Sequence, residues 1–159
     1  MTNPVETPNA VHGCIIMASG LSTRFGSNKL MANLDGAPLI AHAISACDGL
    51  FAKRVAVTRH KDVAKLCRTL GVEAIMHNEP LRSDTVRLGM QAMDGCDTAT
   101  FIQADQPLIS ANTLAALLRD AEAHPEFIWR VGFQDTQGAP VLFPAWAFDE
   151  LRALPPGKG

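Results

Sequence analysis

The sequence predicts an α/β domain built around a largely parallel β-sheet with right-handed crossovers. Three observations lead to this fold class. Short apolar runs of strand length alternate along the chain with longer segments whose apolar residues recur every three to four positions. The first run, 14–18, is apolar throughout, as expected of a central strand that helices cover on both faces. A chain of 159 residues suffices for one domain with a proper core but not for two ordinary ones.

The predicted strands are short runs with alternating or continuous apolar residues. They cover 14–18, 54–58, 72–76, 98–103, 127–133 and 140–143, and a short extended piece at 31–34 ends in an Asp35-Gly36 turn. We expect the last two strands to flank a turn at 135–138. The chain contains no internal repeat and no low-complexity segment.

The predicted helices are placed by their start and stop signals. Pro38 is expected to open the first helix, because its missing N–H falls where no intrahelical bond is made, and Asp48-Gly49 to end it. Serines are expected to cap two later helices. The remaining boundaries are expected at Gly71, Ser83, Gly95, Ser110, Pro125 and Pro144.

The composition excludes several classes of function. Charged residues make up 19% and the net charge is −2, so we expect no basic surface for nucleic acid. The five histidines form no cluster with the spacing of a structural zinc site. The cysteines lack ligand spacing and lie within apolar patterns, so we expect reduced core residues: Cys14, Cys47, Cys67 and Cys96.

The N-terminal segment 1–10 is polar and contains two prolines, so we expect it to be disordered and residues 11–159 to form the single domain. The segment lacks the cationic start and apolar centre of a signal peptide. No apolar run approaches the roughly 18 residues needed to span a bilayer. These features predict a cytoplasmic protein.

A loop of glycines, hydroxyls and cations follows the first strand. Glycines let backbone N–H groups approach a ligand closely, and hydroxyls donate further hydrogen bonds. Arg24 and Lys29 add positive charge. This combination suits a polyphosphate. The alternative is an ordinary surface loop with two solvated cations.

A lone carboxylate, Asp105, follows the strand at 98–103 and precedes Pro107. Mg²⁺ prefers one or two protein carboxylates together with substrate phosphates and water, so one aspartate is enough for part of a magnesium site. A metal–nucleotide complex needs both a phosphate loop and a metal ligand, which favours this interpretation. The alternative is that Asp105 begins a turn.

A third polar stretch follows the strand at 72–76. Ser83 and Asp84 are candidates to contact the base or ribose of a nucleotide, or the phosphate of a second substrate. Their alternative role is to cap a helix. Arg82 and Arg87 are either ligands of the same anion or solvated cations, and His77 is either a site residue or a satisfied edge residue. Because parallel sheets bind ligands at the carboxyl ends of their strands, the three polar stretches are expected to meet.

The spacing of the first loop excludes two common nucleotide motifs. Gly20 and Gly26 are too far apart for GxGxxG, and no lysine directly follows Gly26 as GxxxxGK[ST] requires. The segment MASGLSTRFGSNKL at 17–30 instead resembles the LAAGxSxRxGxxK signature of nucleotidyltransferases with the glycosyltransferase-A-like Rossmann fold.

Within this group the chain most resembles the molybdenum cofactor cytidylyltransferases and related molybdenum hydroxylase accessory proteins. DQPLI at 105–109 is similar to their second motif, and GAPVLFP at 138–144 resembles their later GxPxxF segment. The resemblance covers about 13–154. It implies a Rossmann-like, three-layer α/β/α fold of the nucleotide-diphospho-sugar transferase type.

The resemblance also implies an activity and a set of site residues. The reaction would transfer a nucleotidyl group from CTP, or alternatively GTP, to the terminal phosphate of a molybdopterin cofactor and release pyrophosphate, with a molybdenum hydroxylase as a possible partner. Arg24 and Lys29 would neutralise phosphates, and Asp105 would coordinate Mg²⁺. The nucleotide would be held by Ala18, Ser19, Gly20, Ser22 and Gly26, with Ser83 and Asp84 as further candidates.

The chain departs from the resembled family at two places. Ser19 stands where relatives usually carry alanine or glycine, at a position linked to the choice between cytosine and guanine nucleotides. Relatives also continue to an aspartate-containing segment that supplies a second metal ligand, so the resemblance implies a C-terminally truncated domain. The gene or chain is shortened, or another carboxylate substitutes, or catalysis has been lost.

Two other functions therefore stay open. One is a nucleotidyltransferase that acts on a sugar phosphate or an alcohol phosphate. The other is a non-catalytic accessory protein that binds the cofactor for a hydroxylase.

Overall fold

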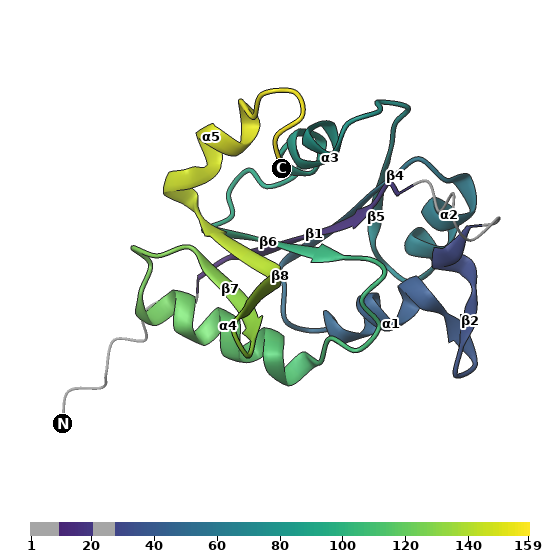
Figure 1. The fold of residues 1–159 in the computed structure, drawn as a ribbon, viewed down its shortest axis with the longest axis horizontal. Coiled ribbons are helices and arrows are strands. Elements are labelled where there is room, and N and C mark those ends of the chain that lie inside the picture. Colours follow the sequence, from purple (N-terminus) through teal and green to yellow (C-terminus); the bar gives the residue numbers. More distant parts are fainter. Residues whose placement is uncertain (1–9, 21–27) are drawn as a thin grey trace.

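The computed structural model describes residues 10–20 and 28–159, and the statements below concern these residues. Strands and helices alternate as the sequence predicts (Figure 1). The strands are β1 (His12–Ala18), β2 (Asn33–Leu34), β3 (Ala37–Pro38), β4 (Lys53–Thr58), β5 (Glu73–Met76), β6 (Thr98–Gln103), β7 (Trp129–Phe133) and β8 (Thr136–Pro144). The helices are α1 (Leu39–Ala46), α2 (Lys61–Thr69), α3 (Arg82–Met90), α4 (Ala111–Ala123) and α5 (Phe148–Arg152), with 3-10 turns η1 (Lys29–Met31) and η2 (Ala145–Ala147).

Six strands form one sheet in the order β5-β4-β1-β6-β8-β7, and β2 pairs with β3 in a separate hairpin. Strands β5, β4, β1 and β6 are parallel to one another. Strand β8 runs antiparallel to β6, and β7 runs antiparallel to β8. The predicted mostly parallel sheet is confirmed, and its four parallel strands bring their carboxyl ends to one edge.

Strand β1 lies in the middle of a three-layer α/β/α arrangement, as predicted. Cys14, Ile16 and Ala18 pack on the face covered by α1, α2 and α4. Ile15 and Met17 pack on the opposite face, against α3 and α5. Figure 1 shows α3 and α5 on one side of the sheet and α1 and α4 on the other. Among the described helices, none has the length and apolar composition needed to cross a membrane.

Helix α3 approaches β1 very closely. A Cβ atom placed on Gly89 would lie 2.6 Å from Cγ2 of Ile15, which is closer than carbon atoms can approach. Glycine at position 89 therefore lets the α3 backbone rest against the central strand. This contact fixes the height of α3 above the sheet, and the beginning of α3 lines the site described below.

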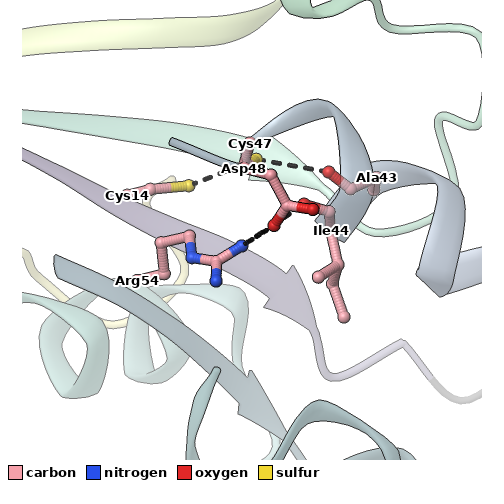
Figure 2. Close-up of polar contacts among 6 residues, drawn as sticks. All are labelled: Cys14, Ala43, Ile44, Cys47, Asp48 and Arg54. Atoms are coloured by element: carbon pink, nitrogen blue, oxygen red, sulfur yellow. Dashed lines mark hydrogen bonds and ion pairs between the residues drawn. The ribbon is translucent and has the colours of Figure 1, made fainter. Parts of the chain in front are cut away.

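The C-terminal end of α1 is joined to β1 and β4 by a cluster of buried thiols and an ion pair (Figure 2). The Cys47 thiol donates to the Ala43 carbonyl across 3.2 Å, and the Cys14 and Cys47 sulfurs lie 3.9 Å apart. Arg54 Nη1 lies 2.6 Å from Asp48 Oδ1. Both cysteines are free and fully buried, so the prediction of reduced core cysteines is confirmed for this pair.

Two predicted boundaries before β6 are wrong. The segment 31–34 is not one extended piece, because the Asn28 side chain accepts the Leu30 N–H and closes the 3-10 turn η1. Only Asn33–Leu34 is extended, paired with β3. Ser83 does not cap α3 either. The N-cap is Leu81, whose N–H donates to Asp84 Oδ2 across 3.0 Å, and Ser83 lies inside the helix.

The C-terminal hairpin also differs from the prediction. Strand β8 is longer than expected because its pairing with β7 continues to Phe133 and Thr136. The turn is therefore the two-residue Gln134-Asp135, in which Gln134 has φ 53°, rather than 135–138. Pro144 does not open the last helix, because it still pairs with Thr98 at the end of β8. The helical turn η2 and α5 follow.

Candidate active site

The carboxyl ends of the parallel strands surround a polar hollow of about 470 Å³, which we call the strand-end cavity. Successive crossovers place β4 on one side of β1 and β6 on the other, and open α/β sheets bind ligands at such a reversal of strand order. The predicted convergence of three polar stretches is confirmed. The cavity is lined by Met17, Ser19, Gly20, Arg59, Glu79, Pro80, Leu81, Arg82, Thr85, Gln103 and Asp105.

Lys29 and Asp105 meet at one end of this cavity. Lys29 Nζ lies 3.2 Å from Asp105 Oδ2, and each side chain is about half exposed, at 44% and 47%. They line a smaller hollow of about 200 Å³ that shares Met17, Gly20 and Gln103 with the strand-end cavity. At this position the Lys29 ammonium can bind phosphate oxygens, and the Asp105 carboxylate can bind a metal cation.

Ser19 lies at another part of the cavity wall and connects three strand ends. Its Oγ lies 3.1 Å from the Val57 carbonyl oxygen on β4 and 2.7 Å from His77 Nε2, just beyond β5. The Glu79 N–H donates to His77 Nδ1 across 3.1 Å. One imidazole therefore links the residue that follows β1 to the loop that follows β5.

These contacts determine the position of the His77 proton. Nδ1 accepts a hydrogen bond from Glu79 and so carries no proton in the neutral ring, which leaves Nε2 as the donor to Ser19. The Ser19 hydroxyl then donates its own proton to Val57. Burial lowers the pKa of His77, Arg59 lowers it further, and Asp84 and Glu79 oppose this change. The neutral ring is therefore the favoured form.

Gly20 is held by a second histidine. His60 Nε2 lies 2.7 Å from the Gly20 carbonyl oxygen. Just before it in the chain, the buried Thr58 hydroxyl donates to the Ala18 carbonyl across 2.9 Å and accepts the His60 N–H. The end of β4 thus fixes the backbone at 18–20, where the predicted phosphate loop begins.

Ser83 and Asp84 do not line the strand-end cavity. Ser83 is fully buried, and its Oγ accepts the Gly157 N–H across 3.3 Å. Asp84 accepts the Leu81 N–H and is paired with Arg87. Asp84 therefore takes the alternative, capping role at the start of α3, whereas Ser83 lies inside the helix and contacts the C-terminal segment. Thr85, the third member of the same predicted stretch, does line the cavity.

Several predicted residues lie outside the described part of the chain. Ser22, Arg24 and Gly26 belong to the segment 21–27. Residues 1–9 of the segment 1–10, which was predicted to be disordered, also lie outside the described part. Of the predicted loop residues, the structure describes Ala18, Ser19, Gly20 and Lys29, and all four line one of the two hollows.

Sequence reasoning missed two charged residues of the cavity wall. Arg59 directly follows β4, and Glu79 follows β5 by three positions. The available signal was their position after a predicted parallel strand, which is the same signal that singled out Asp105. Neither residue belongs to a motif, so their types alone did not distinguish them from solvated charges.

The donor set at Asp105 fits Mg²⁺. The carboxylate supplies a hard oxygen ligand that is half exposed to a hollow with room for phosphate oxygens. Across 10–20 and 28–159, no group of three or more histidines, cysteines, aspartates or glutamates could hold a metal by itself. Such a site would therefore depend on the ligand phosphates for its remaining coordination.

A second, mostly apolar hollow of about 630 Å³ adjoins the strand-end cavity and shares Arg82 and Gln103 with it. Aromatic and aliphatic side chains from β6, β8, η2 and α5 form most of its wall, including Phe101, Phe143 and Trp146. Arg130 adds a second cation. We call this hollow the apolar pocket.

Comparison with known proteins adds three findings. The family model of the MobA-like NTP transferase domain matches residues 14–159. Bifunctional protein GlmU of Micrococcus luteus is 32% identical over 138 residues, which are 77% of this chain and 27% of that protein. The 2-C-methyl-D-erythritol 4-phosphate cytidylyltransferase of Dehalococcoides mccartyi is 28% identical over 133 residues, which are 78% of this chain and 59% of that protein. The chain thus spans less than two thirds of either relative.

The fold has a close counterpart among solved structures. Rv0371c from Mycobacterium tuberculosis H37Rv superposes with a TM-score of 0.79 at 20% identity, over 94% of this chain and 80% of that one. At this level of identity the likeness concerns the arrangement of the layers and the sheet.

Proposed function

Because the chain belongs to the family of MobA-like NTP transferase domains, we propose that it is a Mg²⁺-dependent nucleotidyltransferase. The proposed reaction transfers a nucleotidyl group from an NTP to the terminal phosphate of a molybdopterin cofactor and releases pyrophosphate. CTP is the preferred donor and GTP the alternative. The cytidylyltransferase name of one relative supports CTP.

The single observation that carries this proposal is the meeting of Lys29 and Asp105 at the edge of the strand-end cavity. The two residues are far apart in the sequence: Lys29 begins the 3-10 turn η1, and Asp105 follows the last residue of β6 by two positions. A cation and a carboxylate beside a hollow of nucleotide size are the parts that a metal–triphosphate complex requires.

The proposed chemistry asks little of the protein beyond alignment and charge neutralisation. An oxygen of the acceptor phosphate attacks the α-phosphorus, the bond from that phosphorus to the bridging oxygen breaks, and pyrophosphate leaves with the electron pair. The acceptor phosphate is already ionised, so no general base is needed. Lys29 binds and orients the phosphates, with Arg24 as its proposed partner. Mg²⁺, when bound by Asp105, would supply further neutralisation of phosphate charge.

The apolar pocket supports an acceptor with a planar or apolar portion. It adjoins the strand-end cavity through Arg82 and Gln103, and its aromatic residues offer surfaces for stacking. Arg82 and Arg130 offer charge to an acceptor phosphate. A pterin ring fits this description better than a plain sugar does.

A second candidate acceptor is a sugar phosphate or an alcohol phosphate. The name of the Dehalococcoides mccartyi relative favours it, since that protein acts on an alcohol phosphate. The same pair, Lys29 and Asp105, would serve both acceptors, because it acts on the nucleotide.

The test is pyrophosphate release with Mg²⁺ and each of CTP, GTP, ATP and UTP. Each nucleotide is combined with molybdopterin cofactor, with 2-C-methyl-D-erythritol 4-phosphate, with a sugar phosphate, or with no acceptor. We expect release only with the molybdopterin cofactor and fastest with CTP. Release only with one of the other phosphates would establish the second candidate. Cofactor binding with no release from any nucleotide would instead indicate an accessory protein, whose hydroxylase partner could be sought by co-purification.

A further inference from the structure

His77 lies outside the motifs that carry the family resemblance, yet it contacts two segments of the cavity wall. Its Nε2 lies 2.7 Å from Ser19 Oγ, and its Nδ1 lies 3.1 Å from the Glu79 backbone nitrogen. Ser19 and Glu79 both line the strand-end cavity, and His77 itself is half buried. The ring therefore joins the residue after β1 to the loop after β5 through two hydrogen bonds.

We propose that His77 is a positioning residue for nucleotide binding, whose neutral, Nε2-protonated ring holds Ser19 and the Glu79 backbone in the places that shape the strand-end cavity. The inference rests on the proposed function, because the ligand positioned is its nucleotide. The residue touches no reacting atom in this assignment. It acts through Ser19 and through the loop that carries Glu79, Pro80 and Leu81.

The hydrogen-bond pattern tolerates only one protonation state of the ring. A proton on Nδ1 would face the Glu79 N–H, so two donors would oppose each other. A proton absent from Nε2 would leave Ser19 with a single hydroxyl proton and two acceptors, His77 and Val57. The doubly protonated ring thus loses the Glu79 contact, whereas the other neutral tautomer disturbs both contacts.

Charged groups from three segments face the ring. Arg59 lies at the end of β4, Glu79 in the loop after β5, and Asp84 on α3. Burial has the largest effect, and with Arg59 it lowers the pKa of His77 from the ordinary value of 6.5. Above pH 6.5 the His77 ring is therefore neutral and makes both hydrogen bonds. The contact with Glu79 is lost as the pH falls through the lowered pKa of His77.

Three substitutions remove the contacts of His77 with Ser19 and Glu79, singly or together. His77→Asn places an amide oxygen near the position of Nδ1 and so can accept the Glu79 N–H, but it does not reach Ser19. His77→Gln places an amide nitrogen near the position of Nε2 and so can donate to Ser19, but not accept from Glu79. His77→Ala removes both contacts. His124→Gln is the matched control, because it removes an exposed histidine at the end of α4.

The experiment combines CTP titration with Mg²⁺ and nitrogen-15 spectra of the imidazole in the free protein. We expect the Nε2–H tautomer at about pH 7.5. We expect His77→Ala to weaken CTP binding roughly tenfold, and His77→Asn and His77→Gln to weaken it less. Between about pH 7.5 and about pH 5.5, affinity should fall more steeply in the wild-type protein and in His124→Gln than in His77→Gln.

Either of two results would overturn the inference: an Nδ1–H or charged ring at neutral pH, or unchanged CTP binding in folded His77→Ala. If that variant fails to fold, equal binding by His77→Asn, His77→Gln and wild type would overturn it as well. Failure of the wild-type protein to bind any nucleotide would contradict the proposed function. In that case the tautomer of His77 and the pH dependence of thermal unfolding still decide whether His77 joins Ser19 to the loop after β5.

Discussion

The contacts of the Ser19 hydroxyl determine what this side chain can offer a ligand. Its proton points to the Val57 carbonyl and one lone pair accepts from His77, so a lone pair is what remains for the cavity. A nucleobase that presents an amino group at Ser19 can use that lone pair. A base that presents a carbonyl there would have to break the bond to Val57.

We therefore predict that CTP binds more tightly than UTP, and that Ser19→Ala narrows the difference. One neutral hydrogen bond contributes about 0.5–1.5 kcal/mol, so the expected preference is several-fold to about tenfold. Calorimetric titration of both nucleotides against both proteins measures it. Equal affinity for CTP and UTP in the unmodified protein would contradict the prediction. Ser19→Thr, which keeps a hydroxyl, is the matched control.

For single residues, the prediction succeeded where the charge of a side chain and its place after a predicted strand both indicated a ligand site. Lys29 was predicted as a cation of the glycine-rich loop that follows the first strand, and Asp105 as a carboxylate directly after a later strand; each also belongs to a motif of the resembled family. Ser83 and Asp84 were predicted as ligands, but the structure places them inside α3 with backbone and ion-pair partners. Sequence alone could not decide this, because a helix cap and a ligand contact use the same residue types.

Helix α3 is the element whose position most affects the strand-end cavity. Its first turn carries Arg82 and Thr85 of the cavity wall, and its last turn rests on β1 through Gly89. The sequence predicted the helix and its apolar face. It did not predict the close approach, since a glycine inside a helical pattern carries no information about what lies beneath it.

We predict that Gly89→Ala destabilises the protein. Overpacking against Ile15 costs about 1–3 kcal/mol, which exceeds the gain of about 1 kcal/mol from replacing glycine inside a helix. Urea unfolding followed by circular dichroism measures the change in the free energy of unfolding. Gly138→Ala is the control, because the nearest atom to its added Cβ lies 3.7 Å away. A Gly89→Ala variant as stable as the wild-type protein would show that α3 can move away from β1.

For the molecule as a whole, the alternation of strands and helices was sufficient to predict a mostly parallel sheet with helices on both faces. The two antiparallel strands at the end were predicted as strands, but their turn was misplaced. Asp135 does lie in the turn, but the residue with φ 53° is Gln134 rather than a glycine, and the glycine of the predicted turn, Gly138, lies within β8. The resemblance to nucleotidyltransferases is confirmed by the family match, whereas the molybdopterin acceptor stays a prediction.

The four cysteines, which are all free and buried, lead to a prediction for the molecule as a whole. Burial raises the pKa of Cys67 to about 11 and also raises the pKa values of Cys14 and Cys96. The hydrogen bond with Cys14 lowers the pKa of Cys47, but complete burial keeps a reagent away from that thiol. Thiolates are the reactive form, so native protein should resist alkylation. We expect iodoacetamide to label no cysteine rapidly in the native protein and all of them in urea, as counted by mass spectrometry. Rapid native labelling of Cys14 or Cys47 would contradict the complete burial of these two thiols, whose contacts Figure 2 shows.

We propose that Lys29 and Asp105 form the metal–nucleotide end of the strand-end cavity. The most direct measurement is a calorimetric titration of CTP with and without Mg²⁺, using wild-type protein, Lys29→Ala, Asp105→Asn and the control Asp35→Asn in the exposed β2–β3 turn. We predict that Mg²⁺ strengthens binding to the wild-type protein and to the control, that Asp105→Asn loses this effect, and that Lys29→Ala binds weakly with or without the metal. Binding that is identical in all four proteins, or absent in the wild type, would contradict the proposed role of Lys29 and Asp105.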